Sequence, residues 1–325
     1  MKSACAIAAL VAFSTMTPVS LWAQPEPYPA RPVKVIVPGP PGGGLDVIAR
    51  TVVQRLSESS RGQFYIENLP GAGGSIGSGT AARAPADGYT LLVISQDYVI
   101  HPLIKTKLPY DPFTSFTPVT LIAEAPETLL VNPSVPAKSM KELADVLKAN
   151  PGKYNYATPG FGTSPHLANE RLFKLTLGTD VVHVPFQGAP PAVASTIAGS
   201  TQIVHITLPL VAPHIRAGKL RALAVASHRR APQFPDILTL AEAGFPGHEV
   251  GFWVGIMAPA GTSANVIEWL QNEIRQAMAQ PAAKTQLESL GFELIASTSD
   301  ELRSHIRVES DRWGKVVRDA KIQVQ

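Results

Sequence analysis

The chain has 325 residues, of which 45% are hydrophobic and 16% charged, and its formal net charge is +3. This composition is typical of a globular protein of two ordinary-sized domains. The small charge and the lack of a basic cluster exclude a nucleic-acid-binding surface, and no apolar run is long enough to span a membrane.

Residues 1–23 have the pattern of a secretory signal peptide. Lys2 supplies a short basic region, Ala4 to Phe13 an apolar region, and the cleavage point is expected after Ala23. The one cysteine, Cys5, lies inside this segment. The exported chain is therefore expected to have neither disulfides nor a cysteine nucleophile, which suits a bacterial periplasmic protein with a sizeable core.

The first predicted elements are a strand over Val33 to Val37, a loop rich in proline and glycine, and an amphipathic helix that opens near Leu45. Such a loop leaves backbone N–H groups free at a helix start, which suits an anion. The loop is not a nucleotide-binding one, because it lacks the Lys-Ser/Thr pair and the Gly-x-Gly-x-x-Gly spacing. A tight turn that needs positive φ at a glycine, with no ligand, is an equally good interpretation.

Short apolar runs then alternate with helical patterns, which predicts α/β architecture with mostly parallel strands. We expect irregular structure over 95–118, and we expect 220–225 to cross back toward the first domain. The other expected strands are 64–66, 89–94, 128–131, 154–156, 181–184, 201–206 and 252–257, and the other expected helices lie within 71–83, 139–150, 164–175, 264–279 and 299–320.

A second loop, Thr158 to Ser164, repeats the order of strand, glycine-containing turn and helix start. Ser164 is the predicted N-cap and Pro165 the first helical residue. The hydroxyls of Thr158, Thr163 and Ser164 add donors to the free amides. Both loops follow strands, at the sheet edge where open α/β folds bind ligands, so the pair favours a shared anion site.

The segment Gly73 to Gly77 matches the hydrolase pattern Gly-x-Ser-x-Gly. It makes a secreted serine hydrolase using Ser75 the rival function. That motif requires a buried strand directly before the serine, whereas Asn68 to Gly71 predicts a turn. Packing of a helix made of small residues is therefore the favoured interpretation.

One pair of residues has a spacing that could hold a metal ion. His166 and Glu170 are four residues apart on a predicted helix, but no third ligand with zinc-type spacing follows. His183 and His205 lie within predicted strands and are expected to be buried structural residues. We therefore expect neither a metal nor another cofactor.

Many ordered blocks resemble the extracytoplasmic solute receptors of tripartite tricarboxylate transporters, often called the Bug or TctC family. The resemblance covers nearly the whole chain after the predicted signal peptide. Its carriers are Val37-Pro-Gly-Pro-Pro-Gly-Gly-Gly-Leu-Asp46, Glu67-Asn-Leu-Pro-Gly-Ala-Gly-Gly-Ser-Ile-Gly77, Ala86-Asp-Gly-Tyr-Thr-Leu-Leu92, Leu108-Pro-Tyr-Asp111, Tyr156-Ala-Thr-Pro-Gly-Phe-Gly-Thr-Ser-Pro-His-Leu167, Val182-His-Val-Pro-Phe186, Ala217-Gly-Lys-Leu-Arg-Ala-Leu-Ala224 and Leu240-Ala-Glu-Ala-Gly-Phe-Pro-Gly247.

The resemblance implies a type II periplasmic-binding-protein fold, in which two α/β lobes of mixed sheets flanked by helices close on a ligand. Residues 24–125 and 228–325 would form a discontinuous first domain, and residues 126–227 the second. The hinge would lie at the chain crossings near 123–127 and 225–230.

The implied function is binding, without enzymatic activity. The protein would capture a small organic carboxylate in the periplasm and present it, as a monomer, to the inner-membrane permease subunits of a tripartite tricarboxylate-type transporter. Delivery of the ligand signal to a sensor kinase is an alternative that the sequence leaves open.

The expected ligand contacts come from both loops and from two other strand ends: Gly39, Pro41, Gly42, Gly43, Gly44, Asp46, Ser95, Gln96, Thr158, Gly160, Phe161, Gly162, Thr163, Ser164 and Thr207. Many relatives have Phe at Gly39, so this wall is expected to be roomier or more flexible. Many have Asp at Ile206, so a ligand without an amine is favoured. Asp97 also follows a strand, and it is compatible with a bound anion only if it meets a ligand donor or turns away.

Overall fold

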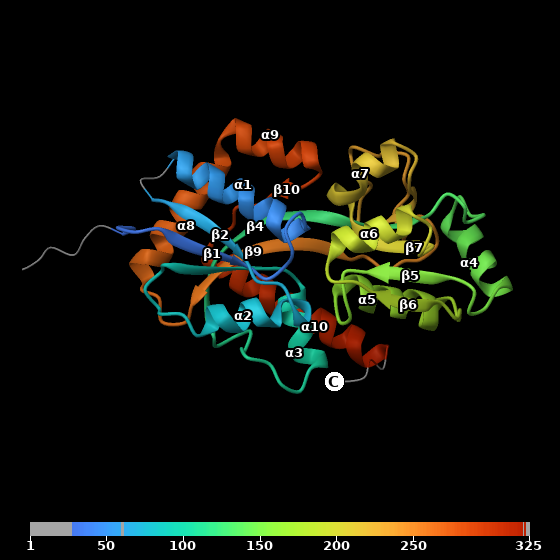
Figure 1. The fold of residues 1–325 in the computed structure, drawn as a ribbon, viewed down its shortest axis with the longest axis horizontal. Coiled ribbons are helices and arrows are strands. Elements are labelled where there is room, and N and C mark those ends of the chain that lie inside the picture. The colour runs from blue at the N-terminus through green and yellow to red at the C-terminus, as the bar shows by residue number, and fades with distance from the viewer. Residues whose placement is uncertain (1–27, 60–61, 321, 323–325) are drawn as a thin grey trace, which may run out of the picture.

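The computed structural model describes residues 28–59, 62–320 and 322, so the predicted signal peptide and Cys5 lie outside the described residues. These residues form two α/β lobes that lie side by side, with the two ends of the chain in one lobe and the middle of the chain in the other (Figure 1). Within this described part, no helix is long and apolar enough to cross a lipid bilayer.

The first lobe contains a sheet in the order β2-β1-β3-β9-β4, with β10 also paired to β4. Its first three strands are parallel, because the chain returns through a helix after β1 and again after β2, whereas β9 runs antiparallel between β3 and β4. The strands are β1 (Val33–Val37), β2 (Phe64–Asn68), β3 (Thr90–Ile94), β4 (Phe116–Val131), β9 (Gly251–Pro259) and β10 (Glu293–Leu294).

Helices cover both faces of this sheet, which is why β3 is an apolar run buried along its whole length. The last helix begins with the predicted capping box, in which Thr298 and Glu301 satisfy each other's backbone N–H groups. The helices of this lobe are α1 (Gly44–Ser59), the 3-10 turn η1 (Ala72–Gly74), α2 (Ser75–Ala82), α3 (Asp97–Ile104), α8 (Ala264–Ala279), α9 (Pro281–Leu290) and α10 (Ser299–Asp319).

The second lobe contains a sheet in the order β6-β5-β7-β4, with β8 also paired to β4. Its strands are β5 (Asn155–Thr158), β6 (Val182–Pro185), β7 (Ile203–Thr207) and β8 (Arg221–Val225). Its helices are α4 (Met140–Ala149), α5 (Ser164–Asn169), which runs on as the π-helix η2 (Glu170–Thr176), α6 (Ala189–Ile197) and α7 (Leu208–Arg216).

Strand β4 belongs to both sheets. Its residues from Phe116 to Pro126 pair with β9, and those from Glu127 to Val131 pair with β7 and β8. At the junction, the Ala226 amide donates to the Glu127 carbonyl over 2.7 Å, and the Val250 amide donates to the Ala226 carbonyl over 2.7 Å. The structure confirms the predicted α/β class, while the exact domain boundaries and the hinge stay predictions.

Two predicted segments are wrong. The stretch 95–118 is not irregular, because it contains α3 and the start of β4, and α3 includes Pro102 near its end. Residues 220–225 do not cross between the lobes, because β8 pairs with β4 inside the second sheet. The chain returns to the first sheet only at β9.

The prediction also missed two helices and shifted one cap. Helices α6 and α7 carry prolines, which discourage a helical prediction, yet Pro190 and Pro209 lie in the first turn, where a missing N–H costs no hydrogen bond. The N-cap of α5 is Thr163, one residue before the predicted Ser164.

Candidate functional site

A cavity of about 140 Å³ lies between the two lobes. A cavity needs about 10–15 Å³ to hold one water, so this one has room for on the order of ten waters or for a small organic molecule. Its walls include residues that follow β1, β3, β5 and β6 and the last residue of β7. The carboxyl ends of these strands meet at the edge where open α/β sheets bind ligands.

Five of the helices in the described part of the chain begin at this cavity. The first residues of α1, α3, α5 and α6 (Gly44, Asp97, Ser164 and Ala189) lie in the wall, as does Thr207, the N-cap of α7. Helix starts carry free N–H groups and a partial positive charge. An anion in the cavity would therefore be stabilised from several directions.

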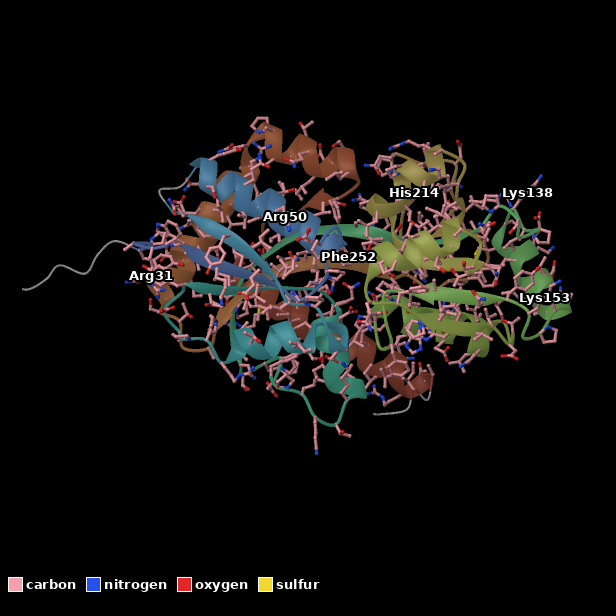
Figure 2. All side chains as sticks on the ribbon, viewed as in Figure 1. Arg31, Arg50, Lys138, Lys153, His214 and Phe252 are labelled. Carbon is pink, nitrogen blue, oxygen red and sulfur yellow. The ribbon has the colours of Figure 1, made fainter. Side chains whose placement is uncertain are left out.

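The described lining contains no lysine or arginine. In Figure 2, Arg31 lies at one end of the molecule and Lys138 and Lys153 at the other, all far from the junction between the lobes. The electrostatic stabilisation of an anion would thus come from backbone amides, helix starts and neutral side chains rather than from a cationic side chain.

Of the fifteen predicted contacts, eight lie in the cavity wall: Gly39, Gly43, Gly44, Ser95, Gln96, Thr163, Ser164 and Thr207. The other seven lie outside the wall: Pro41, Gly42, Asp46, Thr158, Gly160, Phe161 and Gly162. The sequence thus identified which loops form the wall, but within each loop it did not identify which side faces the cavity.

Asp46 holds the first loop in place. Its buried carboxylate accepts hydrogen bonds from the Gly42 amide (2.9 Å), Arg50 Nε (2.8 Å) and Asn68 Nδ2 (2.9 Å). Burial would raise the pKa of Asp46, but these hydrogen bonds outweigh it and hold the pKa below its ordinary value. Pro41 and Gly42 face outward, exposed.

Gly44 and Phe252 bring the first loop and β9 into close contact. A Cβ atom on Gly44 would lie 2.9 Å from Phe252 Cζ, so a larger residue would displace the ring. Figure 2 shows Phe252 where the two lobes meet, and its side chain lines the cavity. Glycine at this position therefore shapes the wall by letting an aromatic ring approach.

The second loop is stabilised by its own side chains. The Thr158 hydroxyl contacts His183 Nε2 at 2.7 Å, and the Thr163 hydroxyl donates to the Gly160 carbonyl over 2.8 Å. Gly162, with φ of +76°, packs against Ile104 of α3. Thr158 and Gly162 therefore shape the loop from behind, and His183 is half-buried rather than fully buried as predicted.

Ser164 links the two lobes by hydrogen bonds inside the cavity. Its hydroxyl accepts from Gln96 Nε2 (2.7 Å) and donates to Glu127 Oε1 (3.1 Å), and its amide donates to Asp97 Oδ1 (3.0 Å). Gln96 is held in turn by the Trp253 amide (3.3 Å). One fully buried serine thus joins α3 of the first lobe to the junction strand β4.

The wall contains two carboxyl groups with raised pKa values. Burial raises the pKa of Asp97 to about 7, although the Ser164 amide and the Lys105 charge act against it. Burial also raises the pKa of Glu127 to about 8, a shift that the Ser164 hydroxyl opposes and the nearby Asp97 charge enhances. Glu127 is therefore mostly protonated at neutral pH.

A neutral histidine lies behind Glu127. His205 Nδ1 donates to the amide oxygen of Asn169 (2.9 Å), because that oxygen can only accept, and burial lowers the pKa of His205 to about 3. His205 Nε2 is then an acceptor, and it faces Glu127 Oε2 at 3.6 Å. The arrangement suits a protonated Glu127, and His205 is buried as predicted.

The serine of the hydrolase pattern and the glutamate of the candidate metal pair are engaged in other hydrogen bonds and ion pairs. Ser75 follows the 3-10 turn η1 rather than a strand, and its hydroxyl accepts from Lys105 Nζ at 3.3 Å. Glu170 accepts from the Tyr156 hydroxyl (2.6 Å) and pairs with Lys174. Over the described residues, no group of three or more His, Cys, Asp or Glu side chains is placed to hold a metal.

Sequence reasoning missed several wall residues, among them Glu127, Gly188 and Phe252. The signal for Gly188 was present, because Gln187-Gly-Ala-Pro-Pro191 follows β6 in the same order of strand, glycine and helix start. Glu127 and Phe252 lie in long strands and carry no such local signal.

Residues 48–322 match the family described as "Tripartite tricarboxylate transporter family receptor", or TctC. The chain belongs to this family. The family that the sequence blocks resemble is thereby confirmed, and its description is that of a receptor.

The fold is shared with solved structures that are at least 30% identical to this chain, among them BugD, Rpa4515 and MatC. The periplasmic binding protein BugD is 30% identical, with a TM-score of 0.87 over 92% of this chain and 100% of that one. Rpa4515 of R. palustris, solved with adipate, is 32% identical, with a TM-score of 0.87 over 91% and 99%. MatC of Rhodopseudomonas palustris, solved with malate, is 32% identical, with a TM-score of 0.84 over 89% and 100%. The two-lobed periplasmic-binding-protein fold is confirmed.

Proposed function

We propose that this protein captures a small organic carboxylate in the cavity between its lobes, in the periplasm, and presents it to the permease subunits of a tripartite tricarboxylate-type transporter. The observation that carries the proposal is the set of five helix starts around one cavity. Malate in MatC and adipate in Rpa4515 support a carboxylate as the ligand class.

The affinity expected from this site is micromolar. Hydrogen bonds to a charged carboxylate contribute roughly 1.5–3 kcal/mol each. Three or four of them, less the freedom lost on association, leave about −8 kcal/mol, which corresponds to a Kd of about 1 μM. A ligand that contacts both lobes also favours their closed arrangement, because only that arrangement offers all the contacts.

We further propose that the ligand lacks an amine. Ile206 lies in the wall, and an aliphatic side chain cannot pair with an ammonium group. Of the two acidic residues in the described wall, Glu127 is mostly protonated near neutral pH and so offers an ammonium group no full negative charge. Asp97 already accepts a hydrogen bond from the Ser164 amide.

A thermal-shift panel tests the ligand class. Succinate, malate, adipate and benzoate are compared with aspartate and glutamate, each at several concentrations. A ligand at about 100 times its Kd stabilises the folded protein by about 2.7 kcal/mol, which gives a shift of several degrees. Stabilisation by glutamate and by no simple carboxylate would reverse the ligand class, and a lack of response to every carboxylate would overturn the function.

Two further experiments test the remaining parts of the proposal. A fluorophosphonate probe is expected not to label the protein, and labelling that disappears in Ser75→Ala would favour the hydrolase instead. Deletion of the gene is expected to abolish uptake of the ligand found in the panel. Unchanged uptake together with a lost transcriptional response would favour delivery to a sensor kinase.

A further inference from the structure

We propose that Asp97 is a built-in competitor for the ligand carboxylate, so that capture of the ligand is accompanied by uptake of one proton onto Asp97. This inference rests on the proposed function. It concerns how the same cavity accepts an anion although its wall already contains two acidic side chains.

The competition follows from the contacts of Ser164. Ser164 is the first residue of α5 and lies in the cavity wall, and its amide donates to Asp97 Oδ1 over 3.0 Å. An internal carboxylate thus occupies a donor that the carboxylate of a ligand would use. Asp97 belongs to the first lobe and Ser164 to the second, so exchange of this bond alters a contact between the lobes.

The charged and titratable groups around Asp97 come from several elements. Lys105, next after α3, is the nearby cation, and its Nζ already donates to the Ala72 carbonyl and the Ser75 hydroxyl. On α3 itself, His101 is neutral, because burial lowers its pKa to about 3. Glu127, on β4, is the nearby acidic group. Tyr110 is neutral as well, because burial and the Asp97 charge both raise the pKa of its phenol.

A ligand carboxylate brings a second negative charge next to Asp97. Two like charges within hydrogen-bond distance in a partly buried site repel strongly, so the protonated form of one of them is favoured. A protonated Asp97 can donate its O–H to the ligand carboxylate, and the Ser164 amide is released to do the same. The proton comes from solvent, and one hydrogen bond is exchanged for two.

Asp97 is the group whose protonation changes most. Its pKa of about 7 leaves it half ionised near neutral pH, whereas Glu127, with a pKa of about 8, is already mostly protonated. Glu127 Oε1 accepts from the Ser164 hydroxyl and from Gln96 Nε2, while its Oε2 faces the neutral His205 Nε2 at 3.6 Å without a hydrogen bond. Near neutral pH, Asp97 is therefore the carboxyl group that takes up the new proton.

The test is calorimetric titration with malate and with adipate at about pH 6.5 and about pH 8.5, where simple carboxylates are ionised throughout. From a pKa of about 7 for Asp97 in the free protein, the affinity of the wild type is expected to fall about 20-fold across this range. Asp97→Asn, which mimics the neutral acid, is expected to match the wild type at the lower pH and to lose most of the pH dependence. The remainder comes from Glu127, whose pKa of about 8 lies inside this range.

Asp145→Asn, at an exposed position of α4, is the matched control and is expected to keep the pH dependence of the wild type. Wild-type affinity that changes less than threefold, or an Asp97→Asn variant that keeps the full dependence, overturns the inference. Binding without pH dependence leaves the proposed function intact, whereas no binding of either probe at either pH overturns both.

A second measurement does not depend on the stability of any variant. Titration of the wild type near pH 7 in two buffers of different ionisation enthalpy counts the protons taken up on binding. Because a pKa of about 7 leaves Asp97 already protonated in half of the free molecules at this pH, the average uptake is expected to be about half a proton per ligand. Uptake indistinguishable from zero overturns the inference.

Discussion

Replacing Ser164 by alanine is the sharpest test of the site. The change removes a fully buried hydroxyl that accepts from Gln96 Nε2 (2.7 Å) and donates to Glu127 Oε1 (3.1 Å). It keeps the backbone amide that donates to Asp97. Ser164→Ala therefore removes the side-chain contribution to the cavity wall and leaves the start of α5 intact.

The expected loss follows from what the two partners keep. Gln96 Nε2 and Glu127 Oε1 still face each other at 3.3 Å, so neither loses every partner. Removal of one partner from a buried hydrogen bond costs about 1–3 kcal/mol. We expect the free energy of unfolding to fall by about that amount and the ligand to bind about 1–2 kcal/mol more weakly, a factor of about 5–30 in Kd.

Urea unfolding measures the first quantity, and calorimetric titration with malate and adipate the second. Ser57→Ala is the matched control, because its exposed hydroxyl donates to the Val53 carbonyl within α1 and is expected to change stability by less than about 0.5 kcal/mol. A Ser164→Ala variant that binds both acids with wild-type affinity would refute the placement of the ligand at Ser164.

Three further variants test other parts of the structure. Glu127→Gln should melt at a higher temperature than the wild type at about pH 9 but not below about pH 5. The pKa of Glu127 in the folded protein is about 8, so the wild type loses stability as the pH rises from the ordinary carboxyl pKa through 8. An equal gain in melting temperature at both pH values would contradict this. Gly188→Ala should bind carboxylates at least about fivefold more weakly, since its Cβ would lie 2.4 Å from Pro40 Cγ of the other lobe. Gly218→Ala is the control, because Gly218 also has a positive φ but its Cβ would have no atom within 4 Å. Both variants are titrated, and equal losses of affinity would show that the contact between the lobes is not the cause. Thr163→Ala should weaken binding by about 1–2 kcal/mol in the same titration, because its hydroxyl holds the Gly160 carbonyl; wild-type affinity would show that this bond is dispensable.

The parts of the site with local signals could be predicted from the sequence. The loops after β1 and β5 combine glycines, a helix start and capping residues within a few positions, so their place in the cavity wall followed from a short-range pattern. Asp46 shows where this fails. It lies in the first turn of α1, where a cavity contact was expected, but its carboxylate bonds to Arg50 and Asn68 and is not part of the cavity wall. Asn68 is 22 residues away in the sequence, so this contact has no local signal.

Residues placed by long-range pairing could not be predicted. Phe252 reaches the cavity because β9 pairs with β4 in a register that sets Ala125 opposite Phe252. Glu127 reaches it because β4 continues from one sheet into the other. Both depend on distant strand partners, since Phe252 pairs with Ala125 and Glu127 with Thr207, and no pattern within β4 or β9 specifies that register.

The position of β9 between β3 and β4 also bears on how the chain is made. Leu92 pairs with Met257 and Leu121 with Gly255, so two early strands have a late strand as their common neighbour. During synthesis, β3 and β4 emerge long before β9, and until then their facing edges have no strand to bond. The first lobe is therefore completed only by the last third of the chain. A chain that completes its first lobe this late stays unfolded for most of its synthesis and can pass through a secretion channel during that time. This order of folding suits the signal peptide that we predict.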